Sequence, residues 1–411
     1  MTIIAAFKSL DRPQRAAFYA SFLGWSLDAF DFFLMVFIIR AIADDFQSQV
    51  KDVAYAVTLT LMFRPLGAFV FGWLADRFGR RPILMLDILL YSAFELASAF
   101  APSLTSLLIL RALFGFAMGG EWGIGSSLVM ETIPAQARGA LSGILQQGYS
   151  VGYLLAAATY GLFFDHVGWR GLFAIGVVPA VVVIYIRLFV KESPVWEQRK
   201  RNAIKSSLTS ALRHHWKLFI YVMLLMTAFN FFSHGTQDMY PTFLQAQHQL
   251  PTGTVSVISI VANLGAMTGG IFFGSYSQRV GRRKAMIIAT LLALPIAPFW
   301  AFASTPILLG LGAFLMQIAV QGAWGVIPAH LNELSPDEVR GTFPGFAYQL
   351  GNFFASYNAV LQVDIARHYD GKYSIAMFSV AVVMAIALAV LAAIGPENKN
   401  VVLGGLQKKP G

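Results

Sequence analysis

GWLADRFGRR, at residues 72–81, decides the fold, because it returns 202 residues later as GSYSQRVGRR at residues 274–283. The same offset relates ETIPAQARG, which begins at Glu131, to ELSPDEVRG, which begins at Glu333. A single offset shared by separate motifs indicates duplication of a long segment. The sequence therefore predicts two related halves.

The composition is that of a membrane protein. Of the 411 residues, 57% are hydrophobic and only 12% are charged, which is roughly half the charge of soluble domains. This excludes an ordinary soluble enzyme and, despite a net charge of +9, a nucleic-acid binder. The absence of cysteine excludes disulfides, thiolate metal sites and a cysteine nucleophile.

Apolar runs of about 20 residues, long enough to cross a membrane as helices, predict an all-α protein with twelve transmembrane helices in two six-helix bundles. The predicted spans are 18–40, 53–74, 82–100, 104–130, 139–163, 169–190, 217–246, 252–276, 284–302, 306–330, 342–364 and 373–394. The predicted domains are a first bundle at 1–190, a central loop at 191–216, a second bundle at 217–396 and a tail at 397–411.

Lysine and arginine orient the chain. Most of the 30 basic residues fall in the predicted loops on the side of the N-terminus, including the loops around 77–81 and 279–284 and the central loop. Basic loops stay on the cytoplasmic side. We therefore expect a multi-pass protein of the cell inner membrane with both termini and the central loop in the cytoplasm.

The segment at 72–81 resembles the signature between the second and third helices of the major facilitator superfamily, and the helix count and the repeat extend that resemblance over the whole chain. The expected gating residues, which would lock the two bundles on the cytoplasmic side, are Asp76, Arg77, Arg80, Arg81, Glu131, Arg138, Arg279, Glu333 and Arg340. Gln278 stands where the first copy has Asp76, so we expect a weaker second latch.

The seventh predicted helix carries NFFSHGTQDMYPT at residues 230–242. It resembles the N-x-x-[ST]-H-x-[ST]-Q-D-x-x-x-T signature of the sialate:proton symporter family, in particular its lactate/pyruvate permease branch. The resemblance implies a proton-coupled symporter of a short monocarboxylate. Sialic acid and aromatic acids remain alternative substrates, and a non-transporting sensor on the same fold remains an alternative class.

Asn230, His234, Asp238 and Thr242 are spaced four apart, so we expect them to form one stripe on a helix face. Such polar groups at membrane depth face a cavity or each other. His234 and Asp238 could share a proton, with Asp28 on the first helix as the rival proton carrier and Asp31 as a further candidate. Asn230 and His234 are also candidate substrate-binding residues. A stripe of hydrogen bonds between helices is the alternative. No third ligand is evident, so we expect no metal.

Two arginines of the predicted spans, Arg111 and Arg64, could each hold a substrate carboxylate. We expect Arg111 to do so through two parallel hydrogen bonds, with a salt bridge to an acidic neighbour as the alternative. We expect Arg64 to pair with Asp28 or Asp31, with substrate contact as the alternative. Glu121 could pair with Arg111 or take part in the proton path.

Further polar residues could bind the hydroxyl or keto oxygen of the substrate, or could serve packing alone: Gln147, Tyr149 and Gln349. A channel would not need two halves with latches, and a membrane-embedded enzyme would need a nucleophile or metal motif that the sequence lacks. We expect a carboxylate and the lipid bilayer as partners, no nucleic acid, function as a monomer, and no cofactor other than the coupling proton.

Overall fold

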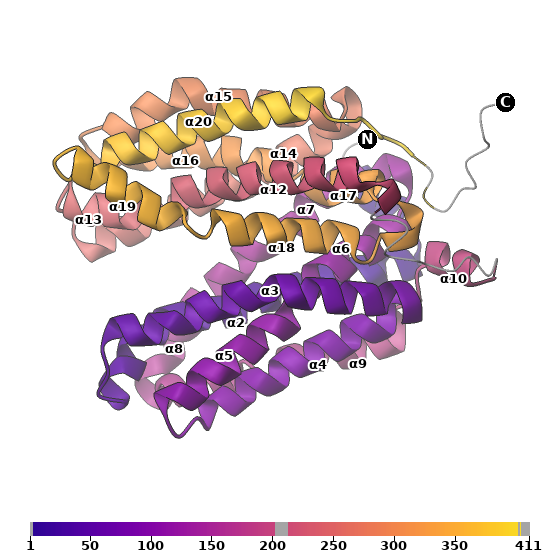
Figure 1. Ribbon diagram of the computed structural model, residues 1–411, viewed down its shortest axis with the longest axis horizontal. Coiled ribbons are helices and arrows are strands. Elements are labelled where there is room, and N and C mark those ends of the chain that lie inside the picture. Colours follow the sequence, from indigo (N-terminus) through magenta and orange to yellow (C-terminus); the bar gives the residue numbers. More distant parts are fainter. Residues whose placement is uncertain (1–2, 202–212, 402, 404–411) are drawn as a thin grey trace.

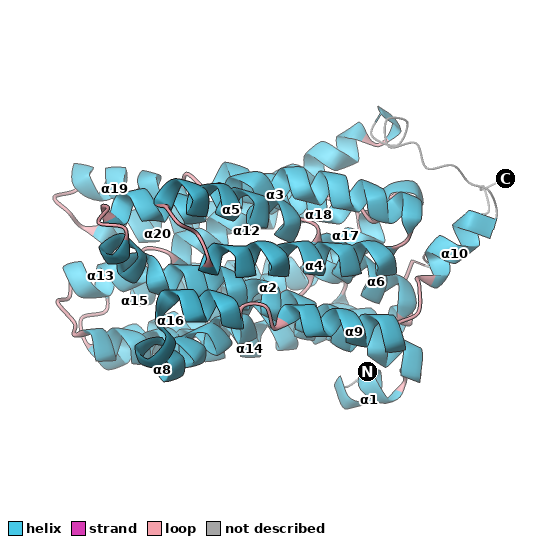
Figure 2. Cartoon of the chain, turned by 90° about the horizontal axis from the view of Figure 1, so that it is seen from below, coloured by secondary structure: helices cyan, strands magenta, loops and turns pink. Residues whose placement is uncertain are grey.

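The computed structural model describes residues 3–201, 213–401 and 403. Figure 1 shows two groups of helices side by side, and Figure 2 shows that their connecting loops gather at the two ends of the molecule. The predicted central loop includes 202–212 and the predicted tail includes 402 and 404–411, all of which lie outside the described residues.

The first group consists of these helices: α1 (Ile3–Lys8), α2 (Arg12–Asp45), α3 (Val50–Phe78), α4 (Arg80–Ala99), α5 (Leu104–Met118), α6 (Glu121–Thr132), α7 (Arg138–Gln146), α8 (Gly148–Ile175), α9 (Pro179–Phe189) and α10 (Pro194–Arg201). The second group consists of α12 (Trp216–Gln237), α13 (Tyr240–Ala246), α14 (Thr252–Val280), α15 (Arg282–Phe302), α16 (Pro306–Trp324), α17 (Ile327–Leu334), α18 (Phe343–Ala355), α19 (Asn358–His368) and α20 (Tyr373–Ile394). Each of the twelve predicted spans coincides with helical segments, and the predicted fold class is confirmed.

Several predicted spans are interrupted in the structure. Among the described residues, ten helical stretches are long and apolar enough to cross a membrane, and one of them, Ala135–Phe189, covers two predicted spans. The predicted span 342–364 is divided between α18 and α19. The break between α5 and α6 falls at Gly119, where a Cβ atom would lie 2.1 Å from the carbonyl oxygen of Arg64. Close packing of α5 on α3 therefore accompanies this break.

The two copies of the duplicated motif form the same sharp turn. Gly79 separates α3 from α4 with φ 113°, and Gly281 separates α14 from α15 with φ 101°, a conformation that favours glycine. Each turn has a carboxylate beside it: Glu192 accepts the backbone N–H of Arg80 at 2.9 Å, and Glu397 accepts that of Arg283 at 3.0 Å. These two acids were not predicted from the sequence.

We call the end of the molecule with the loops at 77–81 and 279–284 the basic end. Helix α10 and the end of α20 lie there in Figure 1, and Figure 2 shows α1 at the same end. Large apolar side chains remain exposed on the outer helix faces, as lipid contact requires, for example Leu188 at 67% and Ile307 at 83%. The halves meet mainly through α7 against α14 and α17, and through α18 against α3 and α6.

Candidate functional site

A cavity of about 480 Å³ lies between the two halves and is lined by side chains from both. Its lining in α3 falls between residues 57 and 64 and in α14 between 259 and 266, whereas these helices run on to the basic end at 78 and 280. The side chains of His234 and Asp238 in its wall are 28% and 42% exposed. The cavity therefore opens away from the basic end.

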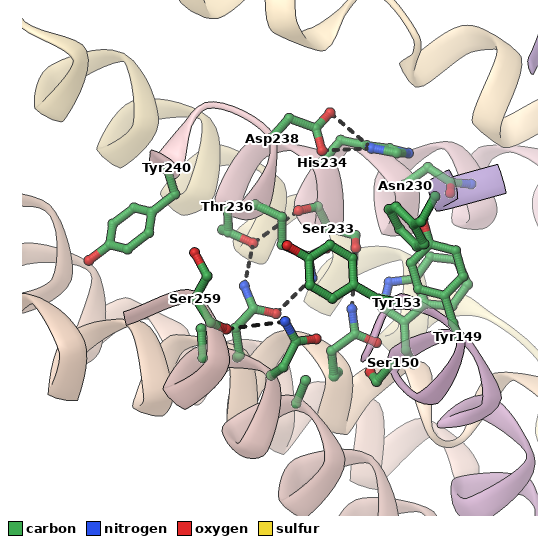
Figure 3. Close-up of a pocket in the computed structure, with 18 of the residues that line it drawn as sticks. Tyr149, Ser150, Tyr153, Asn230, Ser233, His234, Thr236, Asp238, Tyr240 and Ser259 are labelled. Carbon is green, nitrogen blue, oxygen red and sulfur yellow. Dashed lines mark hydrogen bonds and ion pairs between the residues drawn. The ribbon is translucent and has the colours of Figure 1, made fainter. Parts of the chain in front are cut away.

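Aromatic rings from the first half form one wall (Figure 3). The Phe33 ring contacts Tyr153 and Tyr149 at centroid distances of 4.8 and 5.2 Å, and Tyr149 stacks on Trp25 at 5.6 Å. Of these four cavity-lining residues, Tyr149 was a predicted site residue. Interlocked rings of this kind give a rigid, mainly apolar surface with hydroxyl groups at its edge.

Amide side chains of α14 and α16 contribute to the opposite wall. Gln237 donates to Gln317 at 2.7 Å, and the Gln321 amide lies 3.4 Å from the Ser233 hydroxyl. Asn263 also lines the cavity. The sequence analysis missed the two α16 glutamines, although their spacing of four inside an apolar span is the signal that could have identified them.

His234 is held between two partners from different helices. Its Nδ1 lies 3.0 Å from Asp238 Oδ2, and its Nε2 lies 2.9 Å from Asn352 Oδ1 on α18. Since both ring nitrogens face oxygen acceptors, the arrangement suits a protonated ring with two N–H donors. The predicted His234–Asp238 pair therefore exists and lines the cavity.

The predicted stripe ends earlier than the spacing suggested. Asn230 lines the cavity and donates to the carbonyl of Met226 at 2.8 Å. Helix α12 stops at Gln237, and Thr242 lies in the separate helix α13. Thr242 is absent from the cavity lining, because the break at 238–239 ends the four-residue periodicity.

The two arginines lie in places opposite to those expected. Arg111 is fully buried outside the cavity lining, where it donates to Glu95 and Ser98 at 2.7 Å each. Arg64 lines the cavity. It lies over the Phe32 ring at 5.0 Å and donates to the Met118 sulfur at 2.7 Å, and within the described chain it has no ion pair with Asp28 or Asp31. Helix rotation, not depth in the membrane, produces this difference.

The remaining predicted substrate and proton residues are buried away from the cavity lining. Gln147 donates to the carbonyl of Gly143 at 3.2 Å beside α14, and Gln349 is 2% exposed. Asp28, Asp31 and Glu121 are each at most 1% exposed, inside the first half. These five residues therefore face neighbouring helices and not the cavity.

Between the cavity and the basic end, the halves are joined by hydrogen bonds. Asp76 accepts the backbone N–H groups of Gly341 and Thr342 at 2.8 and 3.0 Å, as well as the Thr342 hydroxyl at 2.7 Å. Its counterpart Gln278 accepts one backbone N–H, that of Gly139, at 3.1 Å. The first latch thus has more bonds than the second, in the direction predicted.

The other gating residues divide into two sets. Arg80 pairs with Glu131 at 3.0 Å and Arg282 with Glu333 at 2.9 Å inside each half. Arg138 reaches Glu333, and Arg340 reaches Glu131, both across the halves at 3.9 Å.

Three predicted latch residues stay within their own halves. Arg77 lies over the Trp73 ring at 5.7 Å, Arg81 donates to the Arg187 carbonyl at 2.6 Å, and Arg279 is exposed. Close by, burial raises the pKa of the Glu192 carboxyl above its ordinary value, while N–H groups from Ser193, Arg80 and Arg81 act against this increase.

Comparisons with known proteins agree with this architecture. The sequence pattern of the Major Facilitator Superfamily matches residues 20–360. The carboxylic acid transporter protein homolog of Saccharomyces cerevisiae is 30% identical over 90% of this chain, which spans 65% of that protein's length. The sialic acid transporter NanX of Escherichia coli is 29% identical, with 92% of this chain and 93% of NanX covered.

A niacin transporter, NiaP of Acinetobacter baylyi, is 27% identical over 92% of this chain and 93% of its own. Among solved structures, the proton:xylose symporter XylE superposes with a TM-score of 0.76 at 19% identity, covering 95% of this chain and 98% of XylE. At that identity, the likeness concerns the fold alone.

Proposed function

The chain belongs to the Major Facilitator Superfamily, and from this premise we propose that it is a symporter that carries a monocarboxylate of the lactate or pyruvate type together with a proton. Its relatives include transporters named for carboxylic acids, sialic acid and niacin. Two halves that close alternately on either side of a central site give such transport its mechanism.

The observation that carries the proposal is Arg64 in the cavity wall. A guanidinium can bind a carboxylate through two parallel hydrogen bonds. The Nε of Arg64 is buried and has no hydrogen-bond partner among the described residues, so a donor is available for an anion. Arg111 cannot serve in the same way, because it lies outside the cavity lining, paired with Glu95.

The positive-inside rule supports a cytoplasmic location for the basic end. With that end closed by Asp76 and its partners, the cavity faces the outside of an inner membrane. Carboxylate and proton enter together, and the pair crosses without net charge. His234 and Asp238 add a hydrogen-bonded pair of ionisable side chains to the cavity wall.

A larger ring-bearing acid is the second candidate substrate, favoured by the size and walls of the cavity. A volume of about 480 Å³ is in the range that holds drug-sized ligands, and lactate fills little of it. The rings of Phe33, Tyr149 and Tyr153 could stack on an aromatic substrate, while Gln317 and Gln321 bind its polar substituents.

Uptake into proteoliposomes tests the proposal. With an inward proton gradient, labelled lactate should accumulate, and its entry should make a weakly buffered external medium more alkaline. Competition by pyruvate, benzoate, nicotinate and sialic acid then ranks the two substrate classes. Saturable binding of an acid without any flux would contradict transport and support the sensor alternative.

A further inference from the structure

Several buried charges of the first half remain without a role in the cavity. Beside Asp28 and Asp31, the helices α4 and α6 contribute Asp87, Glu95 and Glu121, all fully buried. None of these five acids is among the residues that line the cavity. Burial of an unpaired charge is costly, so their presence requires an explanation.

The duplication shows that the fold does not need these charges. Its register is fixed in the structure: Gly67 packs on the carbonyl of Phe116, and 202 residues later Gly269 packs on that of Ile318. Near the basic end, the buried charges of the first half are matched by polar residues: Asp76 by Gln278, Arg80 by Arg282 and Glu131 by Glu333. Farther from that end, the positions equivalent to the buried charges of α3 to α6 are all alanine. The pairs are Arg64 and Ala266, Asp87 and Ala289, Glu95 and Ala297, Arg111 and Ala313, and Glu121 and Ala323.

The packing around Glu121 is adapted to the charge. A Cβ atom on Gly24 would lie 2.4 Å from Glu121 Oε1, so this glycine makes room for the carboxyl group. In the second half, Met226 takes the place of Gly24 and Ala323 that of Glu121, and both belong to one apolar cluster. The same position in the two halves is therefore packed with a carboxyl group in the first half and with apolar side chains in the second.

These acids differ in their partners. Glu95 is paired with Arg111 at 2.7 Å. In contrast, neither carboxyl oxygen of Asp87 or of Glu121 has a hydrogen-bond partner among the described residues. Glu121 lies in the electrostatic field of Asp87 and Asp28. Several ionised carboxylates cannot share a dry site without donors or cations, so this site must hold protons.

A second observation indicates that this site binds a proton. The hydroxyl of Tyr91, one turn beyond Asp87 on α4, is fully buried and has no partner among the described residues. It lies in the field of Asp28, Asp87 and Glu121. A phenol can donate to a carboxylate or accept from a carboxylic acid, so it can serve the site in both protonation states.

We propose that the coupling proton is bound by the Asp87–Glu121 carboxyl pair, inside the first half and outside the substrate cavity. This inference rests on the proposed function and replaces the expectation that His234 and Asp238 carry the proton. In the step itself, a proton from water adds to one carboxylate oxygen and forms an O–H bond. That bond breaks again when the site meets water on the other side.

Arg64 connects this site to the cavity. It lines the cavity, and its charge also acts on Asp28, which belongs to the acidic site. When a substrate carboxylate binds Arg64, it neutralises the positive charge that otherwise stabilises Asp28 as a carboxylate. Proton binding then removes the excess negative charge, so substrate and proton bind together.

The experiment compares Asp87→Asn, Glu121→Gln and the double variant Gly24→Met/Glu121→Ala in proteoliposomes. The double variant reproduces the packing of the second half, so it should fold even if the single changes do not. Asp44→Asn, an exposed acid of α2, is the matched control. We expect exchange of labelled for unlabelled substrate to persist, whereas proton-driven accumulation and substrate-induced alkalinisation are lost.

Accumulation at the control level in the variants, or loss of exchange together with accumulation in all three, would overturn the assignment. The readouts separate this result from failure of the proposed function. If the unaltered protein moves substrate without moving protons, symport itself is wrong. If it moves both and the variants do too, only the Asp87–Glu121 assignment is wrong.

Discussion

Arg64 projects into the cavity from α3, while the neighbouring helix α5 buries Arg111 against Glu95. Two guanidinium groups on adjacent helices therefore have different tasks. One lines the cavity, and the other links α5 to α4 through its ion pair with Glu95. The first can bind a mobile anion, and the second stabilises the bundle.

The first prediction concerns Arg64→Lys. Lysine keeps the positive charge but loses the planar pair of donors, so substrate binding should weaken by about 1.5–3 kcal/mol, roughly 10- to 150-fold in Kd. Calorimetric titration of the purified protein measures this change. Arg111→Lys is the control and should bind substrate within about twofold of the unaltered protein. A larger loss of affinity in Arg111→Lys than in Arg64→Lys would show that Arg111 binds the substrate carboxylate.

The second prediction concerns the pair in the cavity wall. His234→Gln leaves the Asp238 carboxylate without its cation, and this negative charge should repel the carboxylate of the substrate. Adding Asp238→Asn removes the charge and should restore part of the affinity, with a coupling energy of about 0.5–3 kcal/mol. Binding measured for both single variants and the double variant gives this energy. Additive effects would show that the two side chains act independently.

At the scale of elements, glycines let helices of opposite halves touch near the basic end. A Cβ atom on Gly143 of α7 would lie 2.4 Å from the carbonyl oxygen of Gly270 on α14. The contact exists because the halves are closed here, and it should part when they open. Helix contacts of this kind are bistable and do not deform gradually.

The third prediction follows from this contact. Gly143→Val overpacks the closed interface, at a cost of about 1–3 kcal/mol, and should shift the population toward the state that is open at the basic end by roughly 5- to 150-fold. Distances between spin labels on α7 and α14 measure this shift. Gly161→Val is the control, because nothing lies within 4 Å of a Cβ atom there. Equal distances in both variants would contradict the proposed gate.

At the scale of the whole molecule, the two halves are closed against each other at the basic end and leave the cavity open toward the far end. Asp76 and the ion pairs between the halves stabilise the closed end. The partly exposed side chains of His234 and Asp238 show that the cavity is open. The orientation of this structure in the membrane decides which solution supplies the substrate.

The fourth prediction tests that orientation. The chain has no cysteine, so single cysteines report accessibility without background. Gln198→Cys on α10 at the basic end should resist a membrane-impermeant thiol reagent in intact cells, whereas Gln249→Cys, at the far end, should react. Both positions are exposed. Reaction at 198 with none at 249 would invert the topology.

The sequence by itself determined the properties that depend on counting along the chain. Span lengths, the duplication at 202 residues and the basic loops are local patterns, and they determined the helical fold class and the positions of the loops that contain Gly79 and Gly281. Periodicity also identified the His234–Asp238 pair, because residues four apart on one helix turn meet without help from other helices.

Tertiary structure alone decided which side chains face the cavity. Depth in the membrane follows from position in the chain, but the rotation of a helix follows from its packing against neighbours. The sequence therefore did not show which of Arg64 and Arg111 faces the cavity, and it did not identify the two glutamines of α16 as cavity residues. Likewise, the break after Gln237 removed Thr242 from its expected stripe, because a helical pattern persists only while the helix continues.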